Sequence, residues 1–441
     1  MMKKFSLIIC TAFLSLMGMA QQVKHVVIIT IDGFRPNFYL DTPWHTPHLH
    51  ELMQSGTYAK GVNSVFPSMT YPSHTTIVTG VQPAKHGVYF NDLFEPTVHT
   101  GKNYWNDSSI HMPTIWQAAH DKGLKTAALL WPVSANAPVD YDVPDIGGMG
   151  EKVREQYSKP AGFVDELKKQ VFNGDTSIQY GKDQNVARIA AYVIKKDQPA
   201  LMTIHFFSVD HAEHTVGRTG QMVKEAISDA DEGVSIIEEA LKQQGIWNST
   251  LLIVAGDHGF HNVVKNIYPN VLLKNAGLLN DSKHDDWKAQ FNTVGGSAYL
   301  YLKDKNDKAT AQKVQEILEA QPDSIKHWFR IISRKQLDQV GANPEVAFAL
   351  SAENDASFGR EATGDITRPG KGGTHGHFPD HQEIQTGFIA HGPNIKTGGV
   401  INEMNLRDIA PLVAKELGFA FPSATGKIPA GLLTDNYTTG Q

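Results

Sequence analysis

Cysteine is almost missing from this 441-residue chain, because Cys10 is its single cysteine and lies in an apolar stretch near the N-terminus. Disulfide bonds therefore cannot hold the folded protein together. A core must do so instead, and a hydrophobic content of 41% is ordinary for a globular α/β protein of this length.

The chain also lacks long runs of one charge and long apolar runs beyond its first residues. Lysine and arginine total 40 against 46 acidic residues, which gives a formal charge of -6. This balance argues against a basic groove for nucleic acid. No stretch after the first residues reaches the roughly 20 apolar residues that a membrane span needs.

The first residues have the pattern of a secretory signal peptide. Lys3 and Lys4 precede the apolar stretch Phe5–Met17, and small residues follow as far as Ala20. The apolar stretch is too short for a membrane anchor. We therefore expect residues 1–20 to be a cleaved signal peptide, and residues 21–441 to form one secreted or periplasmic catalytic domain.

Apolar runs bounded by turn residues alternate with helical patterns along most of the chain. Such runs are typical of buried parallel strands, and they occur at His25–Ile31, Lys125–Trp131, Ala200–Phe207 and Thr250–Ala255. Helical patterns begin at Thr46 and extend over residues 221–244. The sequence therefore predicts a doubly wound α/β fold, with a mostly parallel sheet and helices on both faces.

The alternation weakens between residues 260 and 374. Strand-like patterns at Ser297–Leu302 and residues 328–332 flank a helical pattern at Ala309–Ala320. We expect a small α+β insertion or cap here. The main pattern returns with a strand at Thr386–Ala390 and a helix over residues 405–417.

Carboxylates follow three of the predicted strands. Asp32 comes directly after the first strand, Asp210 lies just beyond the third, and Asp257 lies two residues past the fourth. Ligands of open α/β sheets bind at the carboxyl ends of strands, so these side chains can meet at one edge. Any one of them taken alone could be a turn residue or a helix cap.

Histidines accompany these carboxylates. His214 lies four residues after Asp210, His258 follows Asp257, and His375 lies in the glycine-rich loop 372–377. Zinc accepts carboxylate and imidazole ligands, usually about four per ion. Asp210 and His214 could instead form an exposed ion pair on a helix, and the loop could be a flexible turn. Together the residues indicate a two-metal site.

A candidate nucleophile lies in the segment Val65–His74, which places hydroxyl groups at the start of a predicted helix. Helix N-termini favour anions. The hydroxyl of Thr70 becomes a good nucleophile when zinc coordinates it. Alternatively, Ser68 or Thr70 only caps the helix.

With these residues in place, the chain resembles the nucleotide pyrophosphatase/phosphodiesterase family of the alkaline phosphatase superfamily. The similar motifs occur in order over most of the chain after the leader. They are Ile31-Asp-Gly-Phe-Arg35, Thr46-Pro-His-Leu, Phe66-Pro-Ser-Met-Thr70-Tyr-Pro-Ser-His74, Val78-Thr-Gly80, His86-Gly87 through Asn91, Trp131-Pro132, Gly256-Asp-His-Gly259 and His375-Gly376.

The resemblance implies an alkaline phosphatase-like fold and two Zn²⁺ ions per chain. One ion would be held by Asp210, His214 and His375, and the other by Asp32, Thr70, Asp257 and His258. Asn91 and the backbone amide near the nucleophile would contact a phosphoryl oxygen. Thr70 would attack a phosphodiester or phosphoanhydride in line, and water would hydrolyse the resulting phosphothreonine.

The chain departs from the family pattern at two positions, because Glu213 replaces a usual glycine and His205 replaces a tyrosine. Tyr71 corresponds to an aromatic residue of members that prefer nucleotides. We take Tyr71 and His205 as candidate substrate contacts, although Tyr71 could equally pack against the helix.

Residues 131–138 contain no lysine or arginine. Because a phosphate dianion needs extra positive charge, this favours a singly charged diester. The alternative activities are a phosphomonoesterase or phosphonate hydrolase of the same superfamily. A protein that binds a phosphorylated ligand without catalysis is a third possibility.

Overall fold

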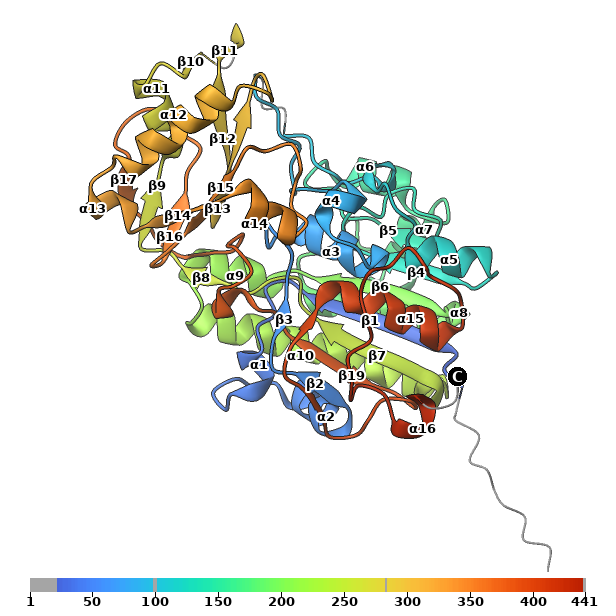
Figure 1. Ribbon diagram of the computed structural model, residues 1–441. Helices are drawn as coiled ribbons and strands as arrows, with labels where there is room; N and C mark the ends of the chain where they lie inside the picture. The colour runs from blue at the N-terminus through green and yellow to red at the C-terminus, as the bar shows by residue number, and fades with distance from the viewer. Residues whose placement is uncertain (1–21, 98–100, 282–283, 439–441) are drawn as a thin grey trace, which may run out of the picture.

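The computed structural model of the protein describes residues 22–97, 101–281 and 284–438 (Figure 1). The predicted signal peptide lies outside these residues. None of the helices within them combines the length and the apolar character that a bilayer crossing requires.

A sheet of eight strands forms the centre of the molecule. Its order is β20 (Gly399–Ile401), β2 (Thr57–Ala59), β19 (Phe388–His391), β7 (Thr250–Ala255), β1 (His25–Ile31), β6 (Leu201–Phe206), β4 (Thr126–Leu129) and β5 (Tyr141–Val143). The strands from β7 to β5 are parallel, whereas β19 runs antiparallel to both of its neighbours. The predicted doubly wound, mostly parallel sheet is confirmed, with β19 as its reversed strand.

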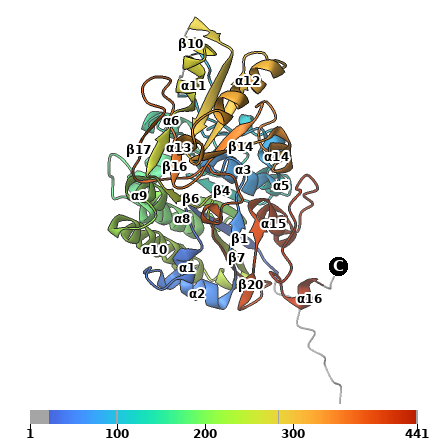
Figure 2. The same ribbon diagram turned by 60° about the vertical axis from the view of Figure 1, so that its left-hand side comes forward.

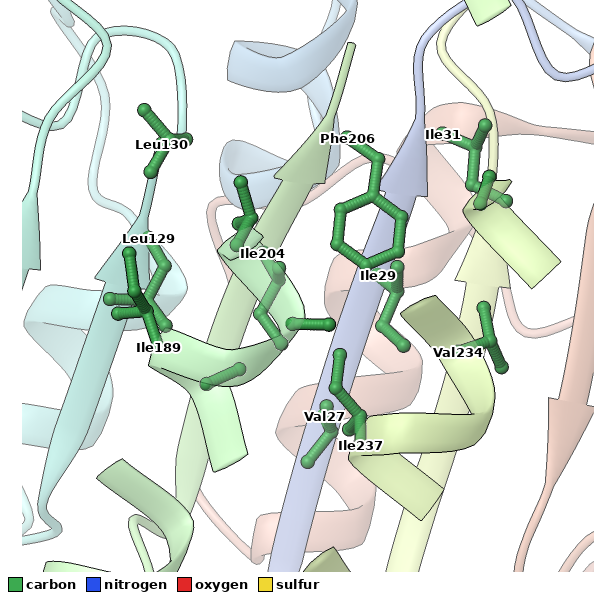
Figure 3. Packing of buried hydrophobic residues seen from close by; sticks show 14 of the residues in the cluster. Val27, Ile29, Ile31, Leu129, Leu130, Ile189, Ile204, Phe206, Val234 and Ile237 are labelled. Carbon is green, nitrogen blue, oxygen red and sulfur yellow. The ribbon is translucent and has the colours of Figure 1, made fainter. Parts of the chain in front are cut away.

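Helices cover both faces of this sheet. Val27 and Ile29 of β1 face the side where Ile189 and Ile237 pack, on helices α8 (Asp183–Asp197) and α10 (Gln221–Gln243) (Figure 3). The alternate residues of β1 join the opposite cluster, which includes residues of α3 (Thr70–Thr79), α5 (Ile115–Asp121) and α15 (Ile409–Leu417). Burial of both faces explains why the central strands are continuous apolar runs.

A second body of structure stands beyond the carboxyl ends of the parallel strands (Figures 1 and 2). It contains an antiparallel sheet ordered β12 (Ala289–Val294), β13 (Ser297–Leu302), β15 (Ala349–Ala352) and β14 (Phe329–Ile332). Helices α11 (Pro269–Asn275) and α12 (Lys308–Glu319) contribute to its own hydrophobic cluster. These elements occupy the segment expected to be an insertion, and its role as a cap stays a prediction.

The other elements are short or lie at the periphery. The helices are α1 (Asn37–Leu40), α2 (Pro47–Ser55), α4 (Pro83–His86), α6 (Glu151–Tyr157), α7 (Phe163–Gln170), α9 (Ser208–Val216), α13 (Asp323–Lys326), α14 (Arg334–Gln339) and α16 (Asp435–Thr438). The strands are β3 (Val62–Asn63), β8 (His261–Asn262), β9 (Lys265–Ile267), β10 (Leu279–Asp281), β11 (Asp286–Trp287), β16 (Ala356–Phe358), β17 (Thr367–Pro369), β18 (Gly373–Thr374) and β21 (Met404–Asn405).

The bounds of two predicted strands differ from the observed ones by two residues at one end. β4 ends at Leu129 rather than Trp131, because Leu130 has a φ of 55°, outside the β region. β19 begins at Phe388 rather than Thr386, whose backbone N–H donates to the Val62 carbonyl on another segment.

Candidate metal centre

The predicted ligands converge at the carboxyl edge of the main sheet. Asp32 follows β1, Asp257 and His258 follow the neighbouring β7, and Asp210 lies on α9 just after β6. Because β19 is antiparallel, the chain enters it from this same edge, which allows His375 to lie there too. Strands far apart in sequence thus supply one cluster, as expected from their shared direction.

Two sets of three ligand atoms lie close enough to hold an ion. The donor atoms of Asp210, His214 and His375 all lie within 4.8 Å of one another, and so do those of Asp32, Asp210 and His258. His258 Nε2 lies 3.2 Å from Asp32 Oδ1 and 3.3 Å from Asp257 Oδ2. Asp210 belongs to both sets and therefore lies between them. The division of ligands between two ions stays a prediction.

The donor atoms of this cluster lack other partners. Asp32 Oδ1, Asp210 Oδ1, Asp257 Oδ2 and His258 Nε2 are buried and have no hydrogen-bond partner among the described residues. Buried polar atoms normally have one. A set of carboxylate oxygens and imidazole nitrogens that face one another in this way fits divalent cations, and zinc in particular.

Crowding of these groups displaces their pKa values. Burial, together with the charge of Asp32, raises the pKa of Asp257 to about 7. Burial alone would lower the pKa of His258, but the charges of Asp257 and Asp32 raise it to about 10. Burial would raise the pKa of Asp32, yet its contacts with His205 and His258 hold that pKa well below the usual range. The carboxylates thus need positive charge beside them.

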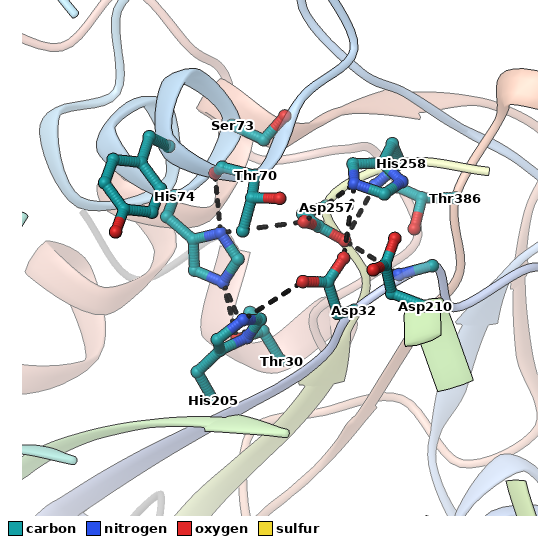
Figure 4. A network of polar contacts seen from close by, with 12 residues as sticks. Thr30, Asp32, Thr70, Ser73, His74, His205, Asp210, Asp257, His258 and Thr386 are labelled. Carbon is teal, nitrogen blue, oxygen red and sulfur yellow. Dashed lines mark hydrogen bonds and ion pairs between the residues drawn. The ribbon is translucent and has the colours of Figure 1, made fainter. Parts of the chain in front are cut away.

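Thr70 is the first residue of α3, whose ten residues end at Thr79. Figure 4 shows its side chain pointing toward Asp257. The residue at the N-cap is Met69, which makes no capping hydrogen bond, while Ser68 Oγ donates to the His377 carbonyl. Neither hydroxyl therefore caps the helix, and Thr70 lies where the N-terminus of α3 favours an anion.

Two buried histidines connect Thr70 to Asp32 (Figure 4). His74 Nδ1 donates to the Thr70 carbonyl over 2.7 Å, so this nitrogen carries the proton. His74 Nε2 lies 3.0 Å from His205 Nδ1, and His205 Nε2 lies 3.3 Å from Asp32 Oδ2. Sequence reasoning placed His74 only within a motif and gave it no role. This chain of contacts depends on the packing of α3 against β6. No sequence pattern near either element predicts that packing.

In the structure, His205 does not occupy the position expected of a residue that contacts the substrate. Its side chain is fully buried behind Asp32, and its Nδ1 also lies 3.0 Å from Thr30 Oγ1. With the side chain enclosed, stacking on a substrate is excluded in this conformation. Its Nε2 instead lies 3.3 Å from the Asp32 carboxylate.

Tyr71 and Asn91 are joined by a hydrogen bond. The Tyr71 backbone N–H donates to Asn91 Oδ1 over 2.9 Å, which leaves the Asn91 amide NH₂ available to another acceptor. The Tyr71 ring is 4% exposed, packs with Val88 and Val133, and donates its hydroxyl to Asp145 over 2.9 Å. Of the two expectations for Tyr71, packing therefore describes its position.

Glu213 is accommodated by a buried ion pair. Its Oε1 accepts from Arg35 Nε over 2.6 Å, and both side chains are almost completely buried. Arg35 also stacks on Phe38, with its guanidinium carbon 4.4 Å from the ring centroid. Gly33 makes room for this pair: its φ is 73°, and a Cβ there would lie 2.8 Å from Glu213 Oε2.

A cavity of about 510 Å³ opens beside these ligands. His214, His375 and Asn91 line one side, and residues of β12 and β16, including Phe291 and Phe358, line the other. Its walls thus come from segments that carry predicted site residues and from strands of the second body.

The chain matches known proteins over most of its length. A sequence model of the type I phosphodiesterase / nucleotide pyrophosphatase family matches residues 26–377. Ectonucleotide pyrophosphatase/phosphodiesterase family member 3 of Mus musculus is 29% identical over 244 residues, covering 53% of this chain and 24% of the relative. Venom phosphodiesterase 2 of Crotalus adamanteus is 24% identical over 385 residues, covering 83% of this chain and 42% of the relative. The chain thus spans less than half of either relative.

Solved structures with the same fold include murine ectonucleotide pyrophosphatase/phosphodiesterase 5. The TM-score is 0.68 at 22% identity, and the match covers 93% of this chain and all of that one. An inactive threonine-to-alanine variant of the same murine protein, in complex with AMP, has the same TM-score at 21% identity.

Proposed function

Because the chain belongs to the type I phosphodiesterase / nucleotide pyrophosphatase family, we propose that it hydrolyses phosphodiester or phosphoanhydride bonds with two zinc ions and Thr70 as the nucleophile. The observation that carries this proposal is the gathering of Asp32, Asp210 and Asp257 with three imidazoles next to the N-terminus of α3. These residues come from separate segments of the chain, and several of their buried donor atoms have no hydrogen-bond partner among the described residues.

The proposed ligand assignment is the one that the family resemblance implies, and the closeness of the side chains supports it. Asp210, His214 and His375 would hold one ion, and Asp32, Asp257, His258 and Thr70 the other. When bound, such a pair of ions lowers the pKa of a coordinated hydroxyl and neutralises charge on the reacting phosphate.

The chain's own groups then position the reaction. The Thr70 Oγ attacks phosphorus, an Oγ–P bond forms, and the bond to the leaving oxygen breaks on the opposite side. The backbone N–H of Thr70 at the start of α3 and the Asn91 amide NH₂ stabilise the nonbridging oxygens. Water then attacks the phosphothreonine and restores the Thr70 hydroxyl. The loss of activity in the threonine-to-alanine variant of the murine relative supports this role.

The proposed substrates are small molecules that carry a phosphodiester or a phosphoanhydride, with nucleotides as the first class to test. The AMP complex of the murine relative supports nucleotides as that first class. A cavity of about 510 Å³ lies within the range of small-molecule sites. The proposed location is secreted or periplasmic.

The direct test is hydrolysis of bis(p-nitrophenyl) phosphate by the full chain. We expect turnover that stops on chelation and returns with zinc, and a rate well above that for p-nitrophenyl phosphate. A faster monoester or phosphonoacetate reaction would replace the proposal with the alternative activities. Protein loaded with zinc but inert on every diester would refute it.

A further inference from the structure

A second group of metal-binding side chains lies outside the centre described above, where the two bodies of the molecule meet. Ring nitrogens of His261 and His381 and a carboxylate oxygen of Glu383 all lie within 4.8 Å of one another. His261 lies on β8, whereas His381 and Glu383 follow β18 in the chain. None of the three belongs to the ligands assigned to the catalytic pair.

The histidine nitrogens of this group are buried without a partner. His261 Nε2 and His381 Nε2 are shielded from solvent and make no hydrogen bond to any described residue. Two unsatisfied buried nitrogens on neighbouring rings are unfavourable. Carboxylates face both: Glu383 Oε2 lies 4.0 Å from His261 Nε2, and Glu353 Oε1 lies 3.3 Å from His381 Nε2.

These separations fit a tetrahedral ion. Bonds of about 2.0–2.1 Å from zinc to nitrogen or oxygen place neighbouring ligand atoms roughly 3.4 Å apart. The distance of 4.0 Å between His261 and Glu383 needs only a small rotation of the Glu383 side chain, which is 46% exposed. Glu353 or a water can occupy the fourth position.

Neighbouring groups hold the rings in place. Asp355 Oδ1 lies 3.6 Å from the other ring nitrogen of His261, on the side where a carboxylate orients a zinc-bound imidazole. The ring of His377 packs against that of His261, with centroids 4.1 Å apart. The ring of His381 lies 5.2 Å from His261, nearly perpendicular to it.

We propose that His261, His381 and Glu383 bind a third divalent ion, with a donor set that suits zinc, and that this ion has a structural role. β18 pairs with β8 through Gly373 opposite Asn262 and Thr374 opposite His261. The segment from β18 to Glu383 also carries His375. An ion at the new site therefore links that segment to β8 at a point that comes after His375 in the chain.

The test is the zinc content of the full chain after zinc loading and dialysis, measured by inductively coupled plasma mass spectrometry. We expect His381→Ala and Glu383→Gln each to lose one ion per chain relative to the wild type. His327→Ala, at an exposed position of the same body, should lose none. Each variant that loses the ion should also melt at a lower temperature than the wild type in zinc buffer.

The outcome separates this site from the catalytic pair. Asp210→Asn should lose zinc at the catalytic centre, and His381→Ala introduced into it should remove one further ion. Equal zinc content in the wild type, His381→Ala and Glu383→Gln would overturn the inference and leave the diester assay untouched. If His381→Ala does not fold, the zinc content of Glu383→Gln decides the question. The Glu383 side chain is partly exposed, and glutamine has nearly the same shape. An inert wild type whose zinc content still depends on Glu383 would refute the proposed function alone.

Discussion

The imidazole of His258 lies flat against that of His375, with ring centroids 3.6 Å apart and planes inclined by 7°. The first residue follows β7 and the second follows β18, and each is assigned to a different ion. A stacked pair of rings has little freedom to slide or separate in a packed interior. This contact therefore sets the spacing between the two proposed ligand sets.

Replacing His375 should disturb both metal binding and the spacing. We expect His375→Ala to bind less zinc and to lose diester turnover by about a hundredfold or more. Zinc analysis and initial rates on bis(p-nitrophenyl) phosphate measure these effects. His284→Ala, at a side chain that is 83% exposed, serves as the control and should match the wild type. Normal zinc content and rates in His375→Ala would contradict the assignment.

Thr70→Ala should remove the nucleophile without unfolding the site. We expect turnover to fall by about 10³-fold or more, with zinc content close to that of the wild type. Thr70→Ser should keep part of the activity because it keeps a hydroxyl. Thr75→Ala provides the matched control in the same helix, since its hydroxyl only donates to the Tyr71 carbonyl. Comparable rates for Thr70→Ala and Thr70→Ser would show that another group attacks phosphorus.

Arg35→Met should destabilise the fold strongly, because it leaves the Glu213 carboxylate buried without its partner. Breaking a buried pair in this way costs about 3–5 kcal/mol. The double variant Arg35→Met/Glu213→Gln should recover part of this loss. Urea denaturation gives the free energies of unfolding. Glu345→Gln, which breaks the exposed pair with Lys305, should change them by less than about 0.5 kcal/mol. A similarly small effect of Arg35→Met would contradict the prediction.

Asp183 should make the protein less stable as pH rises through mildly acidic values. Burial raises its pKa to about 6, although Ser208 and the backbone N–H of Phe207 donate hydrogen bonds to it. An unfolded aspartate has a pKa of about 3.9, so the folded chain binds more protons between these values. This group therefore stabilises the folded state below about pH 4. The free energy of unfolding falls by about 3 kcal/mol as the pH rises from there to about 6.

The variant Asp183→Asn should remove this dependence, since its amide can keep the same contacts. Thermal melts between about pH 4 and pH 7 should show a higher melting temperature for the variant, relative to the wild type, at the upper end of that range. Parallel curves for the wild type and the variant would show that Asp183 does not titrate there.

The main sheet and its ligand edge could be predicted from the sequence for a specific reason. Parallel strands buried on both faces have continuous apolar sequences, and the residues after them meet at one edge. Asp32, Asp210 and Asp257 follow from that rule alone. The antiparallel direction of β19 leaves no trace in its four residues, so no local pattern around His375 shows that it lies at this edge.

Side chains that act through tertiary contacts could not be predicted in the same way. His205 and His74 lie 131 positions apart in the chain, and neither neighbouring sequence indicates that their rings meet behind Asp32. The partner of Glu213 is likewise 178 positions away, at Arg35. In both cases the tertiary contacts decide the role of the residue, because its type alone is compatible with several roles.

The cavity beside the metal ligands is lined by the loop residue Asn91 and the predicted ligands His214 and His375, and also by residues of β12 and β16. On the proposed mechanism, bond cleavage and substrate discrimination are therefore encoded in separate stretches of the chain. Substitutions in β12 can retune which leaving group is accepted while the rate on a small chromogenic diester stays constant. Natural variants that differ in β12 and β16 would keep the same reaction and act on different substrates.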